Sequence, residues 1–172
     1  MKRTKIIGIV CLMLVVLCCL TACGDTNYNA KKAKSVTITA TLTHADGVLL
    51  QKIESVFTKQ GKNYAYTTKN TALNTLNGVQ IGMYATEETS GENNKFAVPT
   101  FVDTDFAAIF EKTETKVFGK LSAEKISAIG IADAQGDVTA TLELDGMSLV
   151  SMTITYTNTK GAQVSIVATM AY

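Results

Sequence analysis

Hydrophobic and polar positions alternate strictly in several parts of the chain. The clearest case is "VTITATLT" at 36–43, where every second residue is apolar and the others are threonines. A period of two with β-branched residues is typical of a strand with one buried face. The same pattern returns at 138–145, at 150–157 and from 162 to 172. These four segments predict strands whose threonines form the solvent face of a sheet.

Turn signals connect the last three of these strands. Asp145-Gly146 and Thr159-Lys160-Gly161 are typical of hairpins. The three strands are therefore expected to form an antiparallel meander. The apolar phase changes between Leu149 and Val150, which predicts a bulge there.

The middle of the chain is less regular. Apolar residues at 48–57 fit both helical spacing and one strand face, and the hairpin signals at Asp46-Gly47 and Gln60-Gly61 favour a strand. Further strands are expected at 63–68 and 79–86. The polar run "EETSGENNK" at 87–95 predicts a loop.

Two short helices are also expected. Asp103 or Thr104 can cap a helix that runs to Lys112, with the side chains of Phe106, Ile109 and Phe110 on one face. A second helix is possible from Ser122 to Ile129, with Gly130 as its C-cap. The pattern as a whole predicts a mainly β (α+β) fold.

The N-terminus has a different pattern. Three basic residues in "MKRTK" precede an uncharged apolar run at 6–20. That run is shorter than the roughly 20 residues of a comfortable membrane span, but it suits the h-region of a secretory signal, about 7–15 residues long. It leads into Leu20-Thr21-Ala22-Cys23. This order of an aliphatic residue, two small residues and cysteine resembles the bacterial lipobox.

The resemblance to bacterial lipoproteins implies how the chain is processed. Residues 1–22 would be a signal peptide that is removed, and Cys23 would carry a covalent diacylglycerol. The protein would be exported and anchored to the outer face of the cytoplasmic membrane, or to the outer membrane in a Gram-negative host. The alternative is an ordinary signal peptide, or a short anchor, with an incidental cysteine.

Processing at Cys23 changes the candidate chemistry. The other three cysteines would leave with the signal, which excludes a disulfide framework and a cysteine-based zinc site. The polar segment 23–35 is expected to be a lipidated flexible tether, and 36–172 a single β-rich domain. The mature chain would have 13 basic and 15 acidic residues and no arginine, so nucleic-acid binding has no support.

Three stretches of the mature domain are similar to the LolA and LppX superfamily of lipid-handling envelope proteins. They are "TLNGVQIGMYATEE", "DTDFAAIFEK" and "MTITYTNTKGAQVSIVATMAY". The family's usual tryptophans and arginines are absent. The resemblance implies a strongly curved antiparallel sheet with one or two short helices packed on its concave face. It also implies an apolar, lipid-like ligand between sheet and helix, bound by Phe106, Ile109, Phe110 and Tyr84.

Catalytic motifs are missing from the sequence. The only histidine, His44, stands two residues from Asp46 and lacks a third ligand for a metal. No G-x-S-x-G motif or phosphate loop occurs, so we expect no enzyme and no cofactor beyond the lipid. Two functions remain open. One is binding of an apolar ligand, and the other is a protein-interaction or accessory module with a fully packed core.

Overall fold

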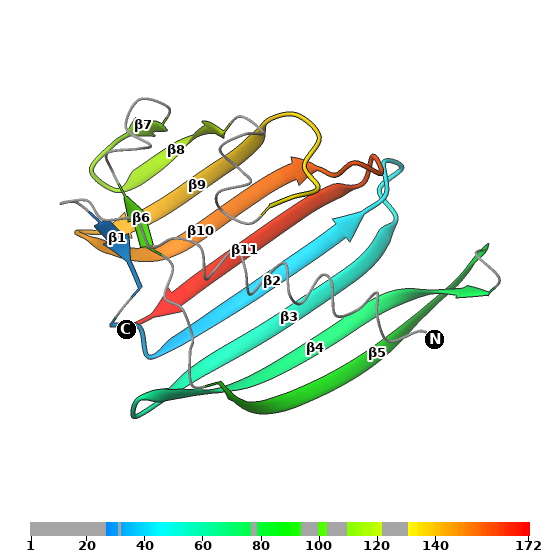
Figure 1. Ribbon diagram of the computed structural model, residues 1–172, viewed down its shortest axis with the longest axis horizontal. Coiled ribbons are helices and arrows are strands. Elements are labelled where there is room, and N and C mark those ends of the chain that lie inside the picture. The colour runs from blue at the N-terminus through cyan, green and yellow to red at the C-terminus, as the bar shows by residue number, and fades with distance from the viewer. Residues whose placement is uncertain (1–26, 31, 77–78, 94–99, 103–109, 122–130) are drawn as a thin grey trace.

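The computed structural model describes residues 27–30, 32–76, 79–93, 100–102, 110–121 and 131–172 (Figure 1). These residues form strands that belong to one sheet. The strands are β1 (Asn27–Asn29), β2 (Ser35–Thr43), β3 (Leu49–Gln60), β4 (Asn63–Leu76), β5 (Val79–Asn93), β6 (Thr100–Val102), β7 (Phe110–Lys112), β8 (Lys116–Leu121), β9 (Val138–Asp145), β10 (Ser148–Thr157) and β11 (Gln163–Ala171).

The long strands are antiparallel and follow the order β5-β4-β3-β2-β11-β10-β9-β8-β7. The last strand of the chain, β11, therefore lies in the middle of the sheet, between β2 and β10 (Figure 1). Two short strands stand beside this path. β1 pairs antiparallel with β6 and meets the start of β10 in parallel.

The core lies on one face of the sheet, which we call the apolar face. It carries the buried residues of β2 and their cross-strand neighbours, so that one continuous row runs through Ala140, Ile154, Ile166, Ala40 and Ile53. Burying each large aliphatic side chain of such a row contributes about 1.5–3 kcal/mol. The pleat that turns these residues inward turns their threonine neighbours to the other side, which we call the threonine face.

The predicted strands with one buried face are confirmed. β2, β9, β10 and β11 coincide with the four alternating segments, and the last three form the expected meander. The register of β9 and β10 shifts between Leu149 and Ser151, where the bulge was predicted. The ambiguous segment 48–57 is strand from Leu49 onward, within β3.

The predicted α+β class is wrong. The structure is all-β, with no helix among the described residues and none packed on the sheet face. Phe110, placed in the first predicted helix, begins β7 and pairs with Gly119. The helical spacing of three apolar residues there covers barely one turn, which is too short to specify a helix. Residues 103–109 and the second predicted helix at 122–130 lie outside the described residues.

The predicted polar loop at 87–95 is also different. β5 continues to Asn93 and pairs with β4 along this length, from Tyr64 opposite Asn93 to Leu76 opposite Val79. All of its residues from Gly82 to Glu92 are exposed. A strand at a sheet edge with neither face buried has no apolar period, so its polar composition resembled that of a loop.

The expected tether is partly folded. Tyr28, Ala30 and Ala33 are buried, and the Lys34 N–H donates to the Ala171 carbonyl at 2.7 Å. The folded domain therefore includes Asn27 and does not start at Val36.

Candidate functional site

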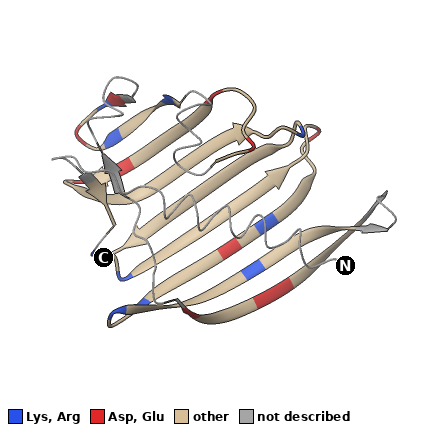
Figure 2. Cartoon of the chain, viewed as in Figure 1, with Lys and Arg blue, Asp and Glu red and all other residues tan. Residues whose placement is uncertain are grey.

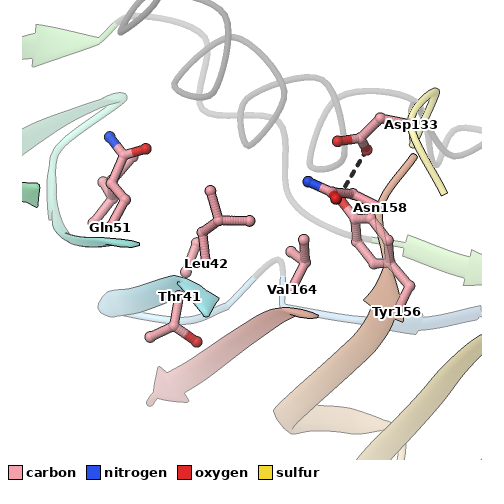
Figure 3. Close-up of a pocket in the computed structure, with 9 residues that line it drawn as sticks. Thr41, Leu42, Gln51, Asp133, Tyr156, Asn158 and Val164 are labelled. Carbon is pink, nitrogen blue, oxygen red and sulfur yellow. Dashed lines mark hydrogen bonds between the residues drawn. The ribbon is translucent and has the colours of Figure 1, made fainter. Parts of the chain in front are cut away.

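A small pocket opens on the apolar face where β2 ends and β11 begins. Its volume is about 60 Å³, and we call it the end pocket (Figure 3). Most of its lining is apolar, with a few polar side chains at the rim. The lining residues are Ala40, Thr41, Leu42, Gln51, Ile53, Asp133, Tyr156, Asn158 and Val164.

The strand register brings these residues together. Tyr156 pairs with Val164, Val164 with Leu42, and Leu42 with Gln51, so one row crosses four strands. Because these positions have the same phase, their side chains leave the same face of the sheet. The pocket floor is thus a direct consequence of the alternating pattern.

A loop before β9 closes one side of the pocket. Ala134 forms an isolated bridge with Asn158. The Gln135 N–H donates to the Thr157 carbonyl at 2.7 Å, and the Thr159 N–H donates to the Asp133 carbonyl at 2.7 Å. These bonds hold Asp133 over the end of β10.

Tyr156 and Asp133 are hydrogen-bonded inside the pocket. The buried Tyr156 hydroxyl donates to Asp133 Oδ1 at 3.0 Å (Figure 3). Burial raises the pKa of Tyr156 well above its usual value, and the charge and hydrogen bond of Asp133 raise this pKa further. Tyr156 therefore stays a protonated hydrogen-bond donor at neutral pH.

Asn158 has a fixed side-chain orientation. It is 7% exposed, and its Oδ1 accepts from the N–H groups of Lys160 at 3.0 Å and Ala162 at 2.9 Å. The oxygen is thereby committed to the turn, and the amide nitrogen points into the pocket (Figure 3). Among the described residues this nitrogen has no hydrogen-bond acceptor.

Gln51 stands on the opposite rim. Its Nε2 donates to Asn70 Oδ1 at 2.8 Å, which leaves its oxygen directed toward the pocket (Figure 3). The pocket thus has an apolar floor, and three of its polar side chains are placed to bond a ligand. Asp133 and Gln51 offer acceptors, and Asn158 offers a donor.

The volume of the end pocket limits the size of a ligand that can enter it. Pockets for whole small-molecule ligands measure about 300–1,000 Å³. A space of about 60 Å³ holds roughly four to six waters, since each water needs about 10–15 Å³. It therefore suits the end of an alkyl chain or a small polar head, and not an entire lipid.

The residues predicted to bind ligand are not brought together at this pocket. Tyr84 lies on β5, is 46% exposed, and its hydroxyl donates to the Leu49 carbonyl at 2.9 Å. Phe110 begins β7, at the other edge of the sheet. Phe106, Ile109 and the predicted acylation site Cys23 lie outside the described residues.

The pocket residues were missed in the sequence for different reasons. Tyr156 has the apolar phase of β10 and could have been placed on the inner face. Asn158 precedes the predicted turn at 159–161, where its side chain caps backbone donors. Asp133 lies in an irregular segment with no periodic signal.

His44 is a turn residue. Its Nδ1 lies 2.9 Å from Asp46 Oδ1, and both side chains are exposed. The pKa of Asp46 is lowered by the Val48 N–H, which donates to it, and by His44. Within the described ranges, no group of three or more potential metal ligands occurs.

The part of the chain that the structure describes contains no helix long and apolar enough to cross a membrane.

Comparisons with known proteins add little. No family model matches the sequence, and no curated protein matches it. Among solved structures, a redesigned β barrel matches 83% of this chain and 94% of its own at 12% identity, with a TM-score of 0.25. A likeness this low carries no argument about fold or function.

Proposed function

We propose that this protein is an extracytoplasmic lipoprotein, anchored to the membrane through Cys23, that binds an apolar, lipid-like ligand without catalysis. The end pocket supports this proposal. It is a mostly apolar hollow at the end of a large apolar sheet face, with a donor and two acceptors placed around it. Binding sites of this type combine an apolar lining with few polar groups that fix orientation.

The rim defines the kind of ligand. The floor formed by Leu42, Ile53 and Val164 suits a hydrocarbon end. A hydroxyl or ammonium group beside it would donate to Asp133 or Gln51, and an oxygen would accept from Asn158. The ligand is thus apolar with a small polar group, and only that end enters the pocket.

The same geometry supports binding over catalysis. Asp133 already accepts a hydrogen bond from Tyr156, and the raised pKa of Tyr156 makes the phenol a weak acid.

Filling the pocket tests the ligand proposal. Val164→Phe puts extra volume into the pocket floor, whereas Val167→Phe adds the same volume on the threonine face of the same strand. Both positions are half-buried. Native mass spectrometry of the purified wild type and of Val167→Phe should show a co-purified apolar ligand, and Val164→Phe should lose it. A wild type without bound ligand, or retention in Val164→Phe, would contradict the proposal.

Acylation has its own test. Cys23→Ala should abolish incorporation of radiolabelled palmitate and leave unprocessed precursor, because the sulfur is the attachment atom. Normal labelling of this variant would overturn the assignment of Cys23.

A second candidate is a protein-interaction module, favoured by the free edge of β5. Among the described residues, this strand ends the sheet and pairs on one side only, with β4. It carries Glu87, Glu88 and Glu92 and no basic residue. An open edge offers unpaired backbone groups to another strand. Cross-linking at β5 tests this function. It would be favoured if the purified protein carried no ligand and one envelope protein were cross-linked to β5.

A further inference from the structure

The folded part of the chain begins very close to the predicted lipid. Cys23 and Asn27 are four residue steps apart, which span at most about 14 Å. From Asn27 the chain enters β1 and is held by the buried side chains of Tyr28, Ala30 and Ala33. If Cys23 is acylated, as proposed above, the end of the domain that contains β1 cannot move far from the bilayer.

That end of the domain, which we call the anchor end, is formed by three chain segments. β1 meets the start of β10, with Asn29 opposite Ser148. The Tyr172 hydroxyl donates to the Leu149 carbonyl at 2.7 Å, which places the last residue there too. Figure 1 shows β1, the C-terminus and the β9–β10 hairpin at the same end of the sheet.

The surface of the anchor end carries exposed apolar and charged side chains. Met147, in the β9–β10 turn, is 60% exposed and Tyr172 is 40% exposed. Both line a hollow of about 260 Å³ together with Asn29, Lys32 and Ser148. Lys34, two residues after Lys32, is also exposed. Exposed acids lie at this end as well: Glu143 and Asp145 on the end of β9, and Glu114 in the adjoining β7–β8 turn.

We propose that the anchor end rests on the bilayer surface, with Met147 entering the interface and Lys32 and Lys34 beside lipid phosphates. Long basic side chains gain from a nearby anionic leaflet. Tyrosine suits a position with one apolar and one wet side. The hollow beside Lys32 has the size and polarity for a lipid headgroup.

This contact would orient the whole domain. β2 starts at the anchor end with Ser35 and runs to Thr43, about 26 Å away at roughly 3.3 Å per residue. Leu42 of the end pocket lies near the far end of this strand. The ligand site would therefore face away from the membrane.

Tryptophan fluorescence tests the contact, because the chain has no native tryptophan. Met147→Trp reports on the anchor end, and Ala45→Trp is the matched control in the exposed β2–β3 turn at the opposite end. Acylated protein is reconstituted into vesicles containing anionic and brominated phospholipids. We expect bromine to quench Met147→Trp at least three-fold more strongly than Ala45→Trp. Replacing Lys32 and Lys34 with glutamate should reduce the difference.

Intact mass measurement separates the two proposals. If Cys23 carries the lipid and the two tryptophans are quenched equally, the membrane contact is overturned and the lipoprotein assignment stands. If Cys23 carries no lipid, both are overturned. Circular dichroism of each variant checks that the sheet is unchanged.

Discussion

Asn158 shows how much of the end pocket depends on one side chain. Its amide oxygen accepts two backbone N–H groups, and its backbone N–H donates to the Ala162 carbonyl at 2.8 Å. The residue thus organises the turn between β10 and β11 and at the same time presents its nitrogen to the pocket.

Asn158→Ala should therefore destabilise the fold. It leaves the Lys160 and Ala162 N–H groups without their acceptor, and the loss of buried hydrogen bonds costs about 1–3 kcal/mol each. Gln163→Ala is the control, because Gln163 is exposed and its Nε2 bonds only the surface Thr157 hydroxyl. Urea denaturation should show a change within about 0.5 kcal/mol for the control. Equal effects of both substitutions would contradict the role of Asn158.

Tyr156 makes stability depend on alkaline pH. Its pKa in the folded state lies above the value of about 10 expected for an unfolded chain. Above pH 10 the unfolded chain loses this proton while the folded chain keeps it, so the free energy of unfolding falls as pH rises. Tyr156→Phe should reduce this slope between pH 9 and about 11. Some slope should remain, because burial also raises the pKa of Tyr64 and Tyr172. An unchanged slope would contradict the assignment.

At the scale of elements, β2 shows why the predicted strands were confirmed. Val36, Ile38 and Ala40 are buried, while Thr37, Thr39 and Thr41 are on the opposite face and none of them is buried. One face of the strand is buried in the core and the other faces solvent. Apolar and polar residues therefore alternate in the sequence with period two.

Two substitutions at neighbouring positions of β2 measure how much each face of the strand contributes to stability. Ile38→Ala removes a buried side chain and should cost about 2–5 kcal/mol. Thr37→Ala changes an exposed position of the same strand and should stay within about 0.5 kcal/mol. Thermal or urea unfolding gives both values. A comparable loss for Thr37→Ala would show that the threonine face is covered by a partner.

The same reasoning explains the failures at this scale. β5 was predicted only as far as Thr86. The residues from Glu87 to Glu92 are exposed and have no apolar period, so the rest of the strand was taken for a loop. The Phe106–Phe110 spacing was compatible with a helix, yet Phe110 belongs to β7. The alternation of apolar and polar side chains reflects which of them are buried. It predicts a strand or a helix only where the buried positions recur with the period of that element.

At the scale of the whole molecule, the hairpins could be predicted and the strand order could not. Short turns specify which strands pair when they are neighbours in sequence. The pairing of β11 with β2 joins Gln163 to Thr43 and Ala171 to Ser35, and no local signal specifies it. The end pocket depends on this pairing, because Val164 and Leu42 lie opposite each other in it. The pocket could therefore not be predicted from the sequence either.

The charged residues also reflect the position of each strand in the sheet. β2, β10 and β11 carry no Lys, Arg, Asp or Glu, whereas β3, β4 and β5 do (Figure 2). Three adjacent uncharged strands would be prone to pair with other chains if they were left open. Placing them in the middle of the sheet covers both edges of each strand.

The central position of β11 also governs when the sheet can form. β2 is among the first strands to leave a ribosome or a membrane pore, and its neighbour β11 is the last. Contacts this far apart in the chain form slowly, because a long loop must close before they stabilise anything. A chain crossing a membrane N-terminus first therefore cannot complete its sheet until its final ten residues have emerged. Until then the chain can pair β2 with β3, β4 and β5 on one side and β9 with β10 on the other, and the arrival of β11 joins the two parts.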